Sequence, residues 1–147
     1  MADVRVLDAT RIADDGERLI DEADEFLILV SPFARLWNEI EDAIIAAQEH
    51  GVETTMVVCK DRHISRELLK ENVPVLVAPD VHAKLYVNER EAILTSYNLT
   101  SHAENSLECG VLVPRAAAPE AYEEALRQAR RAVELGTPGE APARGRR

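Results

Sequence analysis

The sequence reads VHAKLYVNEREAILTSYN over residues 81–98, and residues 82–95 of this stretch predict a β-hairpin. Residues 82–87 and 92–95 have the composition of two strands, and the polar segment 88–91 connects them tightly. Successive side chains of a strand point to opposite faces, so each of these strands has one face suited to a core and one suited to other contacts. A short polar connection between two such runs is typical of an antiparallel hairpin.

Apolar strands alternate with helical patterns upstream of the hairpin. Residues 26–30 are continuous and apolar, as in a strand that is buried on both faces. Segments 4–6, 54–59 and 73–78 are further predicted strands, and apolar residues recur at helical spacing over 12–23, 36–47 and 64–69. Downstream, 107–113 is predicted as a strand and 119–133 as a helix. The order predicts an α/β fold, an α/β/α sandwich with a mixed sheet flanked by helices.

Length and composition are those of one folded domain. The chain has 147 residues, of which 46% are hydrophobic and 30% are charged. We expect the domain to span residues 1–136 and the segment 137–147, rich in Arg, Pro and Gly, to be a disordered tail. The sequence shows no transmembrane span and no secretory signal, so we expect a cytoplasmic protein that does not bind membranes.

The net charge and the cysteine content limit which ligands and metal sites the chain is expected to have. The net charge is −10, which repels a polyanion at long range, although high salt would screen the repulsion. Cys59 and Cys109 form no CxxC pair and have no zinc-ligand spacing, so both are predicted to be buried, reduced thiols. We expect no metal site and no cofactor.

Polar side chains cluster at one end of the predicted hairpin. His82 and Lys84 share one face of the first strand, and Ser96 and Asn98 share a face if the second strand extends that far. A three-residue loop at 88–90 would place His82 opposite Ser96. A slip of one residue would move Ser96 to the far face and disperse the cluster.

A third predicted strand adds an acid to this cluster. Glu108 alternates with the apolar residues of 107–111, so it points toward the His82 imidazole in the expected sheet. An imidazole, a fixed cation and hydroxyl or amide donors suit a phosphate, with the imidazole as nucleophile or base. A glutamate that holds one ring nitrogen leaves the other free to attack. Phe33 and Trp37 follow the strand 26–30 and can stack a base or a lipid head group, but core packing is the default expectation for both.

Residues 81–87 and 92–100 together resemble the signature of the phospholipase D superfamily. The family pattern is H-x-K, four residues, D, six residues and G-S-x-N. In this chain His82 and Lys84 match its first part, and Ser96 and Asn98 match its last part. The similarity continues into 105–108, where family members often carry a catalytic-site glutamate, here Glu108. H-x-K alone is a weak signal, so the joined pattern carries the resemblance.

The sequence departs from the family pattern at three points. Glu89 stands where the family usually has aspartate, Thr95 replaces the glycine, and the connection to the serine is one residue shorter. The resemblance implies catalytic roles for His82, Lys84, Ser96, Asn98 and Glu108. The part of the aspartate is either taken by Glu89 or lost.

The resemblance implies a metal-independent phosphodiester transfer that needs no cofactor. In this family one histidine attacks phosphorus and forms a phosphohistidine, a second histidine protonates the leaving oxygen, and water then resolves the intermediate. Two copies of the motif are needed, and this chain has one. It resembles the small bacterial endonucleases of the superfamily, which build one site across a homodimer axis. We therefore expect a homodimer that acts on nucleic acid, with an interface formed by the hairpin side and the loop 97–105.

Two other functions remain open from the sequence. One is a phospholipase D-like module that binds nucleic acid, phosphate or a protein partner without turnover. The shortened hairpin, the missing aspartate and the acidic charge favour it. The other is a lipid-directed phosphodiesterase, for which the sequence offers no amphipathic basic helix and no membrane anchor.

Overall fold

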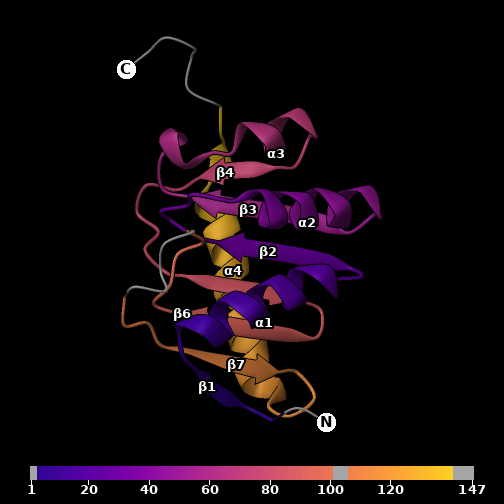
Figure 1. Ribbon diagram of the computed structural model, residues 1–147, viewed down its shortest axis with the longest axis vertical. Helices are drawn as coiled ribbons and strands as arrows, with labels where there is room; N and C mark the ends of the chain where they lie inside the picture. The colour runs from indigo at the N-terminus through magenta and orange to yellow at the C-terminus, as the bar shows by residue number, and fades with distance from the viewer. Residues whose placement is uncertain (1–2, 101–105, 141–147) are drawn as a thin grey trace.

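A mixed eight-stranded sheet forms the centre of the molecule, with helices on both of its faces (Figure 1). The computed structural model describes residues 3–100 and 106–140. The strand order is β1-β7-β6-β5-β2-β3-β4-β8. Strands β2, β3 and β4 run parallel to one another, and every other neighbouring pair is antiparallel. The expected α/β/α sandwich with a mixed sheet is confirmed.

The elements follow the predicted order, with one additional short strand at the C-terminal end. Their bounds are β1 (Arg5–Leu7), α1 (Ala9–Asp21), β2 (Phe26–Val30), α2 (Asn38–Glu49), β3 (Glu53–Val58), a 3₁₀ turn (Asp61–His63), α3 (Arg66–Lys70), β4 (Val75–Val77), β5 (Leu85–Asn88), β6 (Glu91–Thr95), β7 (Gly110–Pro114), α4 (Pro119–Leu135) and β8 (Thr137–Pro138).

Alternate residues of β2 divide the core into two layers. Leu27 and Leu29 face a cluster that includes the apolar faces of α1, α2 and α3, whereas Ile28 and Val30 face a cluster that includes α4. Both faces of β2 are therefore buried, as its continuous apolar sequence predicts. Figure 1 shows α1 and α2 in front of the sheet and α4 crossing behind it. Helices pack on both sides of the central strands, so the ends of these strands hold the following loops in defined positions.

The hairpin register differs from the expectation. Leu85 pairs with Leu94 and Val87 with Ala92, so Glu89 and Arg90 alone form the turn, and not a three-residue loop at 88–90. The pairing is thus shifted by one residue. The shift does not bury His82 on the wrong face of the sheet, because β5 begins only at Leu85 and His82 lies in the segment before it.

The chain ends also differ from the expectation. The first residues of the predicted tail form β8, which pairs with Leu76 and Val77 of β4 and extends the sheet. Strand β4 would otherwise be an unprotected edge, so its free backbone groups explain why the chain continues along it. Residues 141–147 of the predicted tail lie outside the described residues.

The strand predicted at 107–113 begins later than expected. Strand β7 starts at Gly110, where its pairing with Thr95 of β6 starts. Cys109 precedes the strand and is exposed, so the prediction that it is buried is wrong, whereas Cys59 is buried as predicted. Leu107 is fully exposed for the same reason: it precedes the first residue of β7 that pairs with β6.

Candidate active site

The predicted site residues lie along one edge of the sheet. The parallel strands β2, β3 and β4 end at this edge, on the left in Figure 1. Because β5, β6 and β7 are antiparallel to their neighbours, β6 also ends there, and β5 and β7 begin there. The carboxyl ends of parallel strands are where α/β proteins commonly bind ligands.

His82 and Lys84 lie in the segment that leads into β5. The His82 side chain is exposed, and Lys84 is half-buried. The Lys84 Nζ donates a hydrogen bond to the His82 backbone oxygen at 3.1 Å, which folds the lysine side chain back over this segment. Lys84 is joined to the end of β6 by a hydrogen bond from the Thr95 backbone N to the Lys84 backbone oxygen at 3.1 Å. The H-x-K segment is therefore next to the S-x-N segment, as the resemblance requires.

Ser96 and Glu108 form a hydrogen-bonded pair across the ends of β6 and β7. The Ser96 Oγ donates to one oxygen of Glu108 at 2.6 Å and accepts from the Cys109 backbone N at 3.1 Å. The other oxygen of Glu108 accepts from the Ser106 hydroxyl at 2.7 Å. Among the described residues, no hydrogen bond or ion pair joins Glu108 to the His82 ring, contrary to the expectation. Each carboxylate oxygen has a hydroxyl donor instead, and each retains a further acceptor position.

Asn98 is held by the end of β2. Its Oδ1 accepts a hydrogen bond from the Phe33 backbone N at 3.0 Å and lies 3.5 Å from the Oγ of the buried Ser31. That Ser31 oxygen accepts from the Leu99 backbone N at 2.8 Å. The bond from Phe33 settles the orientation of the amide, so the two N–H donors of Asn98 point elsewhere. Within residues 3–100 and 106–140 these donors have no partner, and they remain available to an anion.

Tyr86 anchors this edge from inside the core and does not line the site. It is buried, and its hydroxyl donates to the Tyr97 backbone oxygen. Burial raises the pKa of Tyr86, and nearby Tyr97 and Glu108 raise it further, so the phenol stays neutral. The bond ties the middle of β5 to the segment between Ser96 and Asn98, which fixes the position of both side chains.

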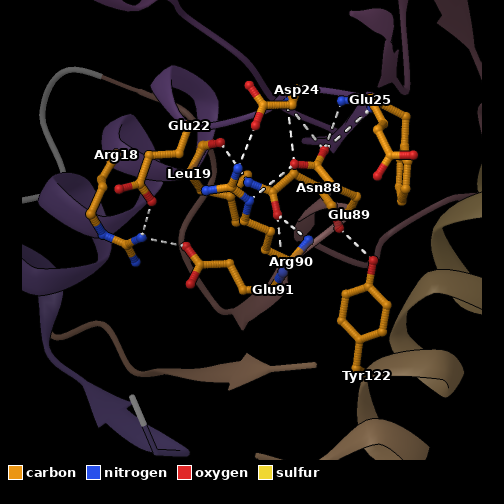
Figure 2. A network of polar contacts seen from close by, with 11 residues as sticks. Arg18, Leu19, Glu22, Asp24, Glu25, Asn88, Glu89, Arg90, Glu91 and Tyr122 are labelled. Atoms are coloured by element: carbon orange, nitrogen blue, oxygen red, sulfur yellow. Dashed lines mark hydrogen bonds and ion pairs between the residues drawn. The ribbon is translucent and has the colours of Figure 1, made fainter. Parts of the chain in front are cut away.

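Glu89, at the aspartate position of the family pattern, lies in the hairpin turn among polar contacts (Figure 2). The turn is at the opposite end of the hairpin from Ser96. Its carboxylate accepts hydrogen bonds from the backbone N of Asp24 at 3.1 and 3.2 Å, of Glu25 at 3.0 Å and of Phe26 at 3.4 Å. Burial raises the pKa of Glu89, but these backbone donors lower it more, and the net result is a pKa below the ordinary value. Glu89 thus holds the hairpin turn against the backbone that leads into β2, away from the candidate site.

A groove that sequence reasoning missed opens beside Asn98. It has a volume of about 600 Å³ and is lined by Phe33, Ala34, Arg35, Arg62, His63 and Thr100. These residues follow the ends of β2, β3 and β6 and come together only when the strands are placed side by side. The one sequence signal was Phe33, for which core packing was the default. Phe33 is 41% exposed, whereas Trp37 does pack against the core.

In the described part of the chain, no three His, Cys, Asp or Glu side chains are grouped as metal ligands. Over the same residues, none of the helices combines the length and the apolarity needed to cross a bilayer.

Comparisons with known proteins agree with this arrangement. The family described as "Cardiolipin synthase, PLD-like domain" matches residues 17–130. A search of curated proteins finds no match. Among solved structures, Nuc from Salmonella typhimurium, a phospholipase D family member, superimposes with a TM-score of 0.78 at 17% identity, covering 94% of this chain and 98% of Nuc.

Two further solved structures are similar. NucT from Helicobacter pylori has a TM-score of 0.72 at 14% identity and covers 92% of this chain and 98% of NucT. The archaeal chromatin protein TrmBL2 has a TM-score of 0.70 at 15% identity and covers 93% of this chain but 54% of its own. At these identities the structures show a shared fold, and the family match extends over most of the sequence. The chain therefore belongs to the phospholipase D-like domain family.

Proposed function

We propose that the protein is a metal-independent phosphodiesterase that hydrolyses nucleic acid at a site shared across a homodimer. Membership of the phospholipase D-like family supports a phosphodiesterase-type function. The observation that carries the proposal is the backbone hydrogen bond from Thr95 to Lys84, which joins the H-x-K segment to the strand end that leads into Ser96 and Asn98. The amide donors of Asn98 are unpaired among the described residues. A nucleophile, a cation and neutral donors are the groups that a phosphodiester requires.

The reaction consists of two displacements at phosphorus. The lone pair of a His82 ring nitrogen attacks phosphorus, a P–N bond forms, and the P–O bond to the leaving group breaks. The leaving oxygen takes a proton from a second imidazole. Water then attacks the phosphohistidine, gives its proton to that same imidazole, and the P–N bond breaks. Lys84 and Asn98 stabilise the charge that develops on the non-bridging oxygens.

The second imidazole is the reason to propose a dimer. A general acid is typically worth about 10²–10⁴-fold in rate, so a site with one histidine would be slow. His82 of the partner subunit supplies the matching group if a two-fold axis passes beside the edge where β6 ends and β5 begins. Leu94 and Leu107, which are 37% and 101% exposed, flank Ser96 and Glu108 and provide apolar surface for such a contact. The predicted interface also included 101–105, which lie outside the described residues.

The test is cleavage of plasmid and single-stranded DNA in the presence of EDTA, at low and at molar salt. We expect the wild-type protein to cut under chelation and the His82→Ala variant to lose the activity. His50→Ala is the matched control, because His50 is an exposed histidine that follows α2. Activity that disappears in EDTA and returns with magnesium, or that survives His82→Ala, would refute the proposal.

A non-catalytic module is the second candidate. The two Glu108 oxygens accept from serine hydroxyls, and neither holds the His82 ring among the described residues. The similar fold of TrmBL2, whose structure was described with a novel mode of DNA binding, also supports this alternative. Binding of DNA without cleavage, in both EDTA and magnesium, would select it.

A further inference from the structure

Cations without an ion-pair partner gather at the same edge of the sheet as the candidate site. Acidic side chains neutralise half of the basic side chains in the described ranges: the ion pairs involve Arg5, Arg18, Lys70, Arg90, Arg115, Arg127 and Arg131. Arg35, Lys60, Arg62 and Lys84 form no ion pair within the described ranges. Arg35 follows β2, Lys60 and Arg62 follow β3, and Lys84 precedes β5. In a protein of net charge −10, these four unpaired cations give this edge a local excess of basic side chains.

The groove beside Asn98 has an aromatic wall and a basic wall. Phe33 and His63 meet edge to face, with ring centroids 5.1 Å apart and an interplanar angle of 83°. Arg62 donates from Nε to the His63 Nε2 at 3.4 Å, and Arg35 lies on the same groove. A volume of about 600 Å³ is within the range of pockets that hold small ligands or parts of a polymer.

Backbone contacts hold the groove in place relative to the site. The Arg35 backbone N donates to the Leu99 oxygen at 2.9 Å, and the Cys59 backbone N donates to the Pro32 oxygen at 3.0 Å. The Phe33 backbone N is the donor that orients Asn98. These backbone contacts hold the groove and the S-x-N segment together, with Asn98 bonded to the Phe33 backbone on the groove wall.

His63 lies near three of these cations. Burial lowers the pKa of His63 most, a backbone hydrogen bond with Ala34 raises it, and the charges of Arg62, Lys60 and Arg35 lower it further. His63 is therefore neutral at pH 7 and presents an aromatic surface, while the charge is supplied by the arginines.

We propose that this groove binds the single-stranded polynucleotide next to the reacting phosphodiester, with Arg35 and Arg62 on its phosphates and Phe33 against a base. The inference rests on the proposed function in that it takes nucleic acid as the substrate. Guanidinium groups bind phosphate oxygens through paired donors. An exposed aromatic ring stacks on a base only if the base has left its own stack, which favours a single strand over a duplex.

The experiment measures binding of a fluorescein-labelled oligothymidine by anisotropy, in a His82→Ala background so that no turnover occurs. A duplex of the same length is the second ligand. Three sets of changes are compared: Phe33→Leu, the pair Arg35→Gln with Arg62→Gln, and the pair Arg127→Gln with Arg131→Gln. The last pair is the matched control, because it removes the same charge from two exposed arginines of α4. All these side chains are exposed, and the Trp37 fluorescence of each variant reports whether it is folded.

We expect Phe33→Leu to weaken single-strand binding by about 5-fold or more and to leave duplex binding unchanged. We expect the Arg35 and Arg62 changes to lower the slope of log K against log salt by about 1.4, which is about 0.7 for each phosphate contact of a single strand. Groove variants that bind like the α4 control, or no single-strand binding by any variant at low salt, would overturn the inference.

The outcomes separate this inference from the proposed function. If wild-type protein cleaves DNA but the groove variants bind like the control, the groove assignment fails and the hydrolytic function stands. If His82 is dispensable or no cleavage occurs, but binding depends on Phe33 and the arginines, the hydrolytic function fails and the groove stands.

Discussion

Replacing Glu89 with glutamine tests how the hairpin turn is held. Oε1 of Glu89 accepts from the backbone N of Glu25 at 3.0 Å, of Asp24 at 3.2 Å and of Phe26 at 3.4 Å, while Oε2 accepts from Asp24 at 3.1 Å and lies 3.5 Å from Arg90 Nε. Glutamine keeps an oxygen for the first set of donors. It places an NH₂ group where Oε2 faces the Asp24 N–H and the Arg90 guanidinium, so donor meets donor.

The expected loss of unfolding free energy in Glu89→Gln follows from the loss of the carboxylate charge. A hydrogen bond to a charged group contributes about 1.5–3 kcal/mol, against about 0.5–1.5 kcal/mol for a neutral one, so two well-formed bonds lose roughly 2 kcal/mol in all. Glu89 is 8% exposed, so water replaces little of this. For a domain of this size, each kcal/mol corresponds to about 2–4 °C in Tm, and we expect a decrease of about 4–8 °C.

The stabilisation by Glu89 decreases as the pH is lowered. The pKa of Glu89 in the folded protein lies below its ordinary value of 4.5, so the carboxylate stabilises the fold fully above that value. The contribution is lost as the pH falls from 4.5 through the lower, folded-state pKa. The difference between wild type and Glu89→Gln should therefore be largest at pH 7 and shrink toward zero in acid.

The assay is urea unfolding followed by the fluorescence of Trp37, the single tryptophan, at neutral and at acidic pH. Asp24→Asn is the matched control: it removes an exposed ion pair with Arg90 but leaves the Asp24 backbone donor, and it should cost less than about 1 kcal/mol. Equal stability of Glu89→Gln and wild type at pH 7, or a penalty that does not change with pH, would refute the reasoning.

Three other predictions concern packing, the chain end and assembly. Gly110→Ala should lower the free energy of unfolding by roughly 1–3 kcal/mol in urea, because a Cβ there would lie 3.0 Å from the Leu94 backbone oxygen and 3.2 Å from the Ile12 side chain. Gly16→Ala is the control: a Cβ there would have nothing within 4 Å, so this change should be neutral or stabilising. Deleting 137–147 should lower the Tm measured by calorimetry, since it removes β8 and the bond from the Gly139 backbone N to the Val75 oxygen at 2.9 Å; an unchanged Tm would contradict a structural role for β8. Sedimentation at molar salt should show a dimer, and equal mixtures of wild type and His82→Ala, refolded together, should retain about one quarter of the wild-type activity if two copies share each site; one half would indicate independent sites.

The pattern of apolar residues was enough to predict the layers of this fold. A continuous apolar run such as 26–30 can be buried only between two layers, and the helical spacing on either side of it supplies those layers. The motif residues come from strand ends that meet at one edge of the sheet, because the ends of strands with known direction fall together. His82, Lys84, Ser96, Asn98 and Glu108 all lie there, although their catalytic roles stay proposals.

The local sequence did not determine the register of the hairpin. Alternation is compatible with either a two-residue turn or a three-residue loop over 88–91, and each choice pairs the strands differently. The choice is made by contacts with distant segments: the Asn88 side chain donates to the Leu19 oxygen at 2.8 Å, and Glu89 binds the backbone that leads into β2 (Figure 2).

The partners of the site residues were likewise decided by tertiary structure. Glu108 was expected to hold His82 and instead accepts from Ser96 and Ser106. The reason is that β7 begins at Gly110, so Glu108 precedes the strand and is not positioned by its alternation. The basic groove joins residues that follow β2 and β3, which are separated in sequence by a helix. Sequence periodicity reports which face of an element is buried, so it determined the layers. It carries no information about which distant groups satisfy a given polar atom, and the folded chain alone determined the register, the hydrogen-bond partners and the groove.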